Sequence, residues 1–211
     1  RYCSKKCQTA DWRNHKRLCV VLDDQLLALQ ATMFNPAALM APLPDGLTLA
    51  GLDERLEKWV KFHTPAMLEA SVHALDLGAG FKRGATHLVR SHLTIRTDHG
   101  NSSAKFFRIK DVEVLSINDA MRLPPPWGAS IDELRRMRES SEESGRGSVI
   151  MMAIDCPPLA TQYVPFCSMR PCNTSGPYCA DWRTVLIDLV ESGRRPRSVP
   201  PVHKTDKCSC C

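Results

Sequence analysis

Apolar residues recur at helical spacing in the stretch that begins near residue 52. The spacing i, i+4, i+7, i+8, i+11 is occupied by Leu52, Leu56, Trp59, Val60 and His63. This pattern predicts an amphipathic helix. The pair Thr64-Pro65 is typical of an N-cap followed by proline in the first helical position. We therefore expect a second helix that starts at this pair, continues through Leu75 and stops at Gly78.

Two runs with strand composition follow these helices. Residues 86–97 and 106–115 are rich in Val, Ile, Leu, Phe and Thr, and residues 98–103 between them have turn composition. The two runs therefore predict a β-hairpin. The alternation in the second run changes phase between Ile109 and Val112, so we expect a β-bulge near Lys110-Asp111.

The remaining pattern predicts two more helices and one more strand. Residues 124–126 are three prolines that interrupt the chain, residues 131–143 predict an exposed charged helix, and residues 148–154 predict a buried strand. A last helix is predicted between a capping Asp181 and a terminating Gly193. Its apolar stripe consists of Trp182, Val185, Leu186, Leu189 and Val190. The fold class is therefore α+β, a mixture of helices and antiparallel strands.

Composition limits the classes of protein to consider. With 211 residues, of which 43% are hydrophobic and 24% charged, the chain has enough apolar material for a core. No run approaches the roughly 18 apolar residues of a membrane span, so we expect none. The formal charge of +5 is spread along the chain, and we therefore do not expect a nucleic-acid partner. Because the first residue is Arg1 and not Met, either the chain has been processed or the sequence is part of something longer, and the residues that follow favour the second.

The ten cysteines are distributed unevenly. Three lie in the first nineteen residues, four between 156 and 179, three in the last four positions, and none between 20 and 155. A disulfide-stapled secreted domain would spread its bridges through the core. The distribution therefore favours metal ligation in a reducing compartment, and we expect an intracellular protein of the cytoplasm or nucleus.

The first nineteen residues carry a metal-ligand pattern. Cys3, Cys7, His15 and Cys19 have the spacing C-x3-C-x7-H-x3-C. Residues 11–19 predict a helix, on which positions four apart share one face. Thiolate and imidazole are the donors that zinc prefers. The segment has few aliphatic residues to hold it together otherwise, so these four residues are the predicted zinc ligands.

The same segment closely resembles the second half of a MYND-type zinc finger. The matching positions are Tyr2, Cys3, Cys7, Gln8, Asp11, Trp12, His15, Lys16 and Cys19. The resemblance implies that the two cysteines of the first pair share one zinc with an earlier C-x2-C pair, and that His15 and Cys19 share another. Both earlier pairs are absent here. Either they lie upstream of Arg1, or the four remaining donors hold one zinc in a rearranged site.

The resemblance also implies a role in protein-protein interaction. MYND fingers take up short proline-containing peptides, and the positions equivalent to Gln8 and Trp12 contribute to the groove. An indole face stacks well on a proline ring, and a glutamine amide pairs with an extended backbone. The alternative for Trp12 is packing against the zinc-bound loop. More weakly, the region from Trp59 to Gly193 resembles uncharacterised fungal MYND-finger proteins.

The sequence gives no positive sign of catalysis. It contains neither a G-x-S-x-G elbow nor a G-x-x-x-x-G-K loop, and the glycines at 78, 80 and 84 fit a helix stop better than a dinucleotide motif. Histidines 87 and 92 are expected to be satisfied or solvent-facing. Some MYND fingers are joined to SET domains, so a SET-like protein lysine methyltransferase is the alternative function. The Asn-His-x-Cys-x-Pro-Asn segment of such a domain is missing, and we expect a non-enzymatic protein.

These observations divide the chain into four parts. Residues 1–19 are the C-terminal half of a finger, 20–51 a helix and a Pro-punctuated linker, 52–193 an α+β globular domain, and 194–211 a disordered basic tail ending in cysteines.

The spacings of Cys156, Cys167, Cys172 and Cys179 fit no closed zinc pattern, so loosely packed thiols are expected. Cys208 lies at the position of a prenylated cysteine, but Ser209 and Cys210 are poor substitutes for aliphatic residues.

Overall fold

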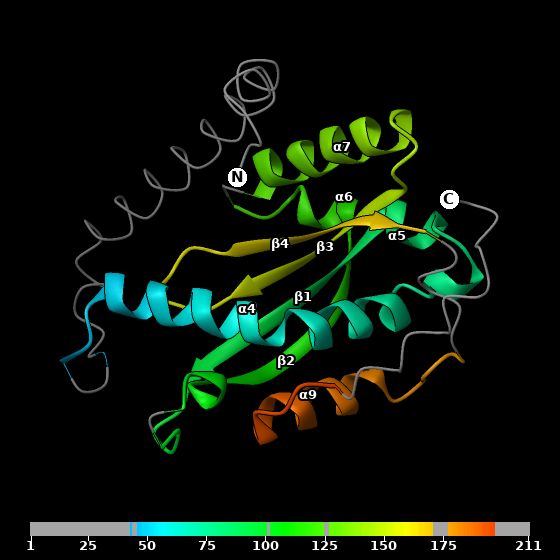
Figure 1. The fold of residues 1–211 in the computed structure, drawn as a ribbon. Helices are drawn as coiled ribbons and strands as arrows, with labels where there is room; N and C mark the ends of the chain where they lie inside the picture. Colours follow the sequence, from blue (N-terminus) through cyan, green and yellow to red (C-terminus); the bar gives the residue numbers. More distant parts are fainter. Residues whose placement is uncertain (1–42, 44–45, 101, 125–126, 171–176, 197–211) are drawn as a thin grey trace, which may run out of the picture.

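A computed structural model describes residues 43, 46–100, 102–124, 127–170 and 177–196. Its centre is a four-stranded sheet in the order β2-β1-β3-β4. The strands are β1 (His87–Ile95), β2 (Phe107–Ser116), β3 (Ser148–Asp155) and β4 (Gln162–Met169). The α+β class is confirmed, but the expectation of antiparallel strands alone is wrong, because β1 and β3 are parallel. The helical connection between β2 and β3 returns the chain to the end at which β1 begins (Figure 1).

The predicted hairpin and its bulge are confirmed. β1 and β2 pair antiparallel from His87 opposite Ser116 to Ile95 opposite Phe107. The register shifts where His92 lies opposite Asp111 and the next residue, Leu93, lies opposite Ile109. Lys110 is therefore the extra residue, as the change of phase in the sequence predicts.

A single long helix replaces the two that Pro65 was expected to separate. Helix α4 (Leu49–Ala74) contains Pro65 in its interior, and Thr48 caps its start by accepting a hydrogen bond from the Gly51 N–H. A proline at position 65 leaves the Lys61 carbonyl without its helical donor. One unbroken buried face continues past the proline and outweighs that loss: Leu52, Leu56, Trp59, His63, Ala66, Met67, Ala70, Ser71 and Ala74.

The predicted stop at Gly78 is also wrong. α4 ends at Ala74, and a short 3-10 helix, η2 (Leu77–Ala79), and a single-turn helix, α5 (Lys82–Thr86), follow before β1. Gly84 packs tightly there, since a Cβ on it would lie 3.0 Å from the Ile150 side chain. The glycines therefore do not stop α4: Gly78 lies within η2, and Gly84 allows a close contact with β3.

The second half of the chain contains one strand that its pattern did not predict. η3 (Ser103–Lys105), α6 (Ile117–Ala120) and α7 (Trp127–Glu143) precede β3, and α9 (Trp182–Ser192) follows β4. β4 was missed, and Pro165 lies within it at the edge of the sheet, where a missing N–H is tolerated. Gly193 ends α9 in the left-handed conformation as predicted, but the Asp181 side chain makes no capping hydrogen bond.

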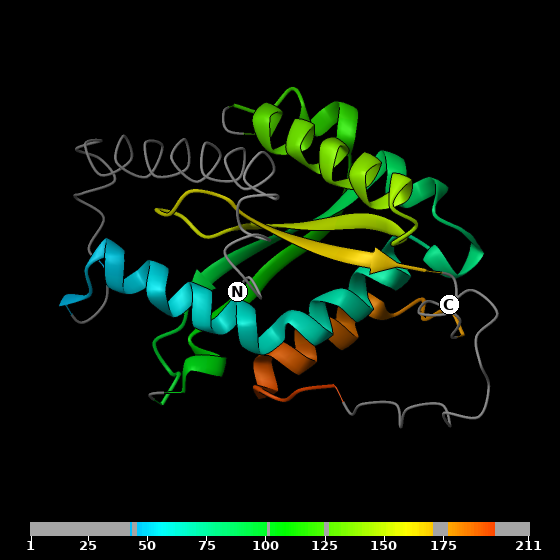
Figure 2. The same cartoon turned by 45° about the horizontal axis from the view of Figure 1, so that its top comes forward.

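The sheet lies between two unequal layers of helices. Figure 2 shows it between α7 on one face and α4 on the other, with α9 beside α4. The α4 face forms the larger core, which includes Trp59, Phe107 and Met152. The α7 face forms a smaller core around Trp127, Ile131 and Met151. β3 lies between the two and is buried along its whole length.

Candidate functional site

The sequence-predicted site lies outside the described residues. This applies to the four zinc ligands Cys3, Cys7, His15 and Cys19, to the two groove residues Gln8 and Trp12, and to most of the tail with Cys208. The predicted helix and linker at 20–51 also lie outside the described part except for residues 43 and 46–51, of which the last three begin α4. The structure therefore tests neither the ligand set nor the groove.

The cysteines in the described part of the chain do not form a second metal site. Cys156 is buried, Cys167 is exposed and Cys179 is half-buried, and all three are free thiols. Among the described residues, no group of three or more His, Cys, Asp or Glu side chains is placed to hold a metal ion. Burial, reinforced by the charge of Asp155, raises the pKa of Cys156 to about 12. This thiol is therefore protonated at neutral pH and is neither a nucleophile nor a ligand there.

A group of polar side chains lies on the sheet where the parallel pairing of β1 and β3 ends. We call it the Asp155 cluster, which consists of Arg90, His92, Glu113, Asp155 and Thr161. Arg90 donates from Nε to Asp155 Oδ2 at 2.7 Å, and its Nη2 lies 2.6 Å from the same oxygen. Thr161 donates to the other carboxylate oxygen at 2.6 Å. Asp155 thereby connects β3 to β1 and to the loop before β4.

The other two members of the cluster are held more loosely. The ring nitrogens of His92 lie 3.5 Å from an Asp155 oxygen and 3.5 Å from a Glu113 oxygen. The Arg90 Nη1 lies 3.4 Å from Glu113. The Glu113 side chain is 40% exposed, whereas that of Asp155 is 11% exposed. The expectation that His92 is satisfied is met, because it lies between the carboxylates of Asp155 and Glu113. The short contacts in the cluster are those between Arg90 and Asp155.

Aromatic side chains shield one side of this cluster. The Arg90 guanidinium carbon lies 5.2 Å from the centre of the Trp127 ring, and Tyr163 packs edge-on against the same ring at 5.4 Å. Burial raises the pKa of Tyr163 to about 12. Asp155 accepts from both Arg90 and Thr161. The arrangement of the cluster is that of a clamp between strands.

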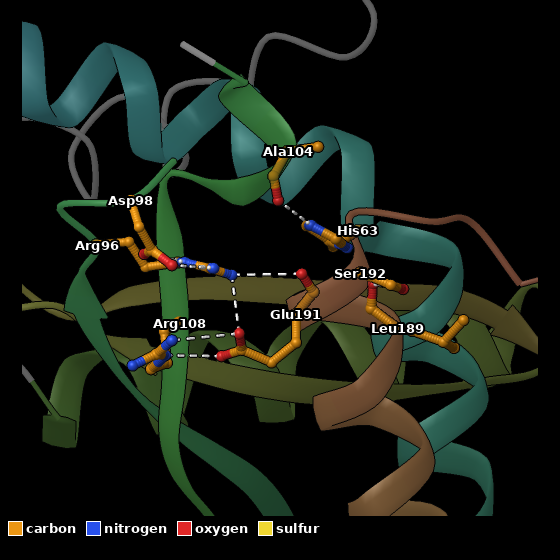
Figure 3. Close-up of polar contacts among 8 residues, drawn as sticks. All are labelled: His63, Arg96, Asp98, Ala104, Arg108, Leu189, Glu191 and Ser192. Atoms are coloured by element: carbon orange, nitrogen blue, oxygen red, sulfur yellow. Dashed lines mark hydrogen bonds and ion pairs between the residues drawn. The ribbon is translucent and has the colours of Figure 1, made fainter. Parts of the chain in front are cut away.

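A second group of charges fixes the end of the hairpin to α9. Figure 3 shows Glu191 of α9 between Arg96 and Arg108, with bonds of 2.8 Å to each, and Arg96 also bonded to Asp98. The hydrogen bond from Arg96 lowers the pKa of Asp98 to about 2. All four groups are paired with one another, so this group also has a structural role.

His63 is the one fully buried histidine in the described part of the chain. Its Nε2 lies 2.8 Å from the Ala104 carbonyl oxygen (Figure 3), and since a carbonyl only accepts, Nε2 carries the proton. The Nδ1 atom is buried without a hydrogen-bond partner. Desolvation lowers the pKa of His63. His63 is thus a neutral core residue that anchors η3 to α4.

Two hollows lie beside α4 and α5. A cavity of about 30 Å³ between α4 and α9 is lined by Glu69, His73, Cys179 and Trp182 among others, and the Cys179 N–H donates to His73 Nδ1 at 3.3 Å. That space suits one or two water molecules. A wider open depression of about 370 Å³ lies beside α5, where Lys82, Arg83 and Asp76 contribute charges of both signs. The smaller hollow is lined by the thiol of Cys179 and the ring of His73, and the wider one by Thr86 and His87, whose side chains lie 2.9 Å apart in a hydrogen bond.

The residues of the Asp155 cluster were missed by the sequence interpretation. Arg90 and His92 lie two positions apart on β1 with the buried Ser91 between them, which shows that they share a face. Glu113 and Asp155 become their neighbours only through the pairing of three strands. The sequence of β1 alone therefore indicates that Arg90 and His92 lie on one face. It does not indicate which residues of β2 and β3 lie beside them.

Comparison with known proteins supports a function only for the first segment. No helix in the described part of the chain is long and apolar enough to cross a membrane. The chain matches no curated protein and no solved structure. The resemblance of the downstream region to fungal proteins therefore stays a prediction. Residues 1–19 match the family model of the MYND finger, and this match supports a zinc finger that binds metal and takes part in protein-protein interaction.

Proposed function

We propose that this protein binds zinc through Cys3, Cys7, His15 and Cys19 and recruits partner proteins through the finger so formed. The observation that carries the proposal is the MYND match at residues 1–19, which coincides with the donor spacing C-x3-C-x7-H-x3-C. Three thiolates and one imidazole suit the tetrahedral preference of zinc. Because the segment has few aliphatic residues, metal binding supplies its folding free energy.

The partners in this proposal are proteins with proline-containing segments. Gln8 directly follows Cys7, Trp12 lies three positions before His15, and the two residues offer an amide and an indole ring. A proline-rich segment is already extended, so it loses little conformational entropy when it docks on an aromatic side chain. The α+β domain then acts as a non-catalytic scaffold. Two observations support that role, namely the engagement of Asp155 by Arg90 and Thr161 and the raised pKa of the Cys156 thiol.

Metal analysis of the full-length gene product tests the zinc site. The wild-type protein should contain tightly bound zinc, and His15→Ala or Cys19→Ala should remove most of it. Cys179→Ser is the matched control, since it removes a half-buried thiol outside the finger and should leave the zinc content unchanged. Cobalt substitution adds a direct readout, because thiolate-to-cobalt absorption requires cysteine ligands. Wild-type protein with neither zinc nor this absorption would refute the proposal.

Peptide binding tests the groove separately from the metal. Trp12→Ala should weaken binding of a proline-containing peptide by about tenfold or more, as expected when an aromatic anchor of an interface is truncated. Gln8→Ala should have a smaller effect. Both variants should keep their zinc. Loss of zinc in Trp12→Ala would show instead that the indole packs against the metal-bound loop.

Calorimetry with S-adenosylmethionine separates the scaffold from the methyltransferase alternative. A scaffold should give no binding heat, whereas a SET-like enzyme should bind this cofactor with measurable heat.

A further inference from the structure

We propose that Ser144 is a phosphorylation site whose phosphate is bound by Arg146 and Arg170. This inference is independent of the zinc finger and concerns the turn between α7 and β3. Ser144 follows the last residue of α7 and is exposed, as are its neighbours Gly145 and Arg146.

The Ser144 hydroxyl is already in contact with one guanidinium group. Arg146 donates from Nε to Ser144 Oγ at 2.7 Å. The hydroxyl in turn donates to the Ser140 carbonyl at 2.8 Å. Within the described residues, Arg146 forms no ion pair with a carboxylate. Its positive charge is therefore directed at the oxygen that a kinase would modify.

A second guanidinium group is brought to the same turn by close backbone packing. Arg170, just beyond β4, donates from Nη2 to the Gly145 carbonyl at 3.2 Å. The approach depends on Gly147, which has a φ of +94° and lies so near the Met169 carbonyl that a Cβ would be 2.5 Å from it. The end of β4 is thereby held against the turn, and arginines that are 24 positions apart in the sequence reach adjacent residues of the turn.

Phosphate is the ligand that best fits this arrangement. Guanidinium groups form short charge-assisted hydrogen bonds to phosphate oxygens, often two at a time. Glu142 and Glu143 and the carbonyl end of α7 oppose a negative charge here. The Glu142 carboxylate, however, accepts a hydrogen bond from the Ser148 hydroxyl at 3.1 Å. Against this repulsion, Arg146 and Arg170 bring two positive charges to the turn, where a phosphate dianion can pair with both.

The reaction requires ATP and a serine kinase. The γ-phosphoryl group forms a bond to Ser144 Oγ as its bond to the β-phosphate oxygen of ATP breaks. ADP leaves, and the hydroxyl proton passes to the catalytic carboxylate of the kinase. The phosphate so attached would join the end of β4 to the α7–β3 turn through Arg146 and Arg170.

Kinase treatment of the full-length chain tests the modification itself. The protein is incubated with Mg-ATP and purified serine kinases of basic-directed and acidic-directed specificity, and phosphate is located by tandem mass spectrometry. We expect phosphate on Ser144 in the wild type and its absence at that position in Ser144→Ala. An unmodified Ser144 in peptides that cover residues 140–148, with every kinase, would overturn the proposal.

Phosphorus NMR tests the two arginines. Phosphoserine is incorporated at position 144 during synthesis, and the phosphate is titrated in the native and the urea-unfolded chain. Arginine contacts should raise its second ionisation constant about three- to tenfold in the native protein. Arg146→Gln and Arg170→Gln should each reduce this difference. Arg135→Gln, which changes an arginine paired with Asp132 on α7, should not. Equal ionisation constants in the native and unfolded chains would overturn the clamp, with circular dichroism confirming that each variant is folded.

Discussion

The two faces of the sheet are built from different kinds of residue, although the same strands supply both. On the α4 face, the buried side chains of β1 and β3 are apolar or small. Helix α4 contacts both strands, and α9 beside it contacts β2. On the α7 face, the same strands start with the apolar Leu88 and Val149, whereas their parallel pairing ends at His92 and Asp155. Polar residues therefore occur where helical cover is incomplete. The α4 face therefore contributes most of the apolar burial that stabilises the fold. The α7 face accommodates charged side chains because they are paired with one another.

The largest effect is expected on the α4 face. Trp59 is 1% exposed and contacts Phe107 and His63. Trp59→Ala should lower the free energy of unfolding by about 3–5 kcal/mol, as is typical of a buried aromatic residue. Urea unfolding followed by circular dichroism measures this. A loss below about 1 kcal/mol would contradict the assignment of the main core to this face.

A smaller effect is expected on the α7 face. Asp155→Ala should cost about 2 kcal/mol, because it leaves the partly buried Arg90 without its main partner. Glu113→Ala on the same face should change stability by less than about 1 kcal/mol, since Glu113 is 40% exposed. A double-mutant cycle with Arg90→Leu measures the coupling of each pair. Equal coupling of Arg90 to both carboxylates would show that burial does not distinguish them.

Acidification should weaken the α4 face through His63. The pKa of His63 is lower in the folded than in the unfolded protein, so the unfolded chain binds the proton first. Stability is therefore constant above the unfolded pKa of about 6.5 and is lost as pH falls from there through the folded pKa. Comparing urea midpoints between pH 7.5 and 5 tests this. The wild type should lose more stability over that range than His63→Gln, and parallel profiles would contradict the prediction.

The smallest effect is expected at the exposed edge of α9. Val185 is 42% exposed although it belongs to the predicted apolar stripe. Val185→Ala should change the free energy of unfolding by no more than about 0.5 kcal/mol. Leu186→Ala, one position further along the helix and 1% exposed, should cost about 2–5 kcal/mol. Similar losses for both variants, measured by urea unfolding, would show that the stripe is buried across its whole width.

Local patterns identified most elements but not their ends. The period-two runs located both strands of the hairpin, and the change of phase at Ile109 located the bulge, because alternation is a property of consecutive residues. Pro65 was misinterpreted, since the cost of a proline in a helix is local, whereas the buried face that offsets it is formed with the sheet. β4 escaped notice because Pro165 interrupts its pattern, and only pairing with β3 makes it a strand.

The candidate zinc site is the part of the protein that the sequence determined by itself. The types and the spacing of the predicted ligands are properties of one short continuous segment. The MYND match at residues 1–19 depends on the amino-acid sequence of that segment alone. Tertiary structure decided the parallel pairing of β1 and β3, the pairing of Arg90 with Asp155, and the approach of Arg146 and Arg170 to one turn. The physical reason is distance along the chain. Contacts between residues tens of positions apart depend on the packing of whole elements, which no local pattern records.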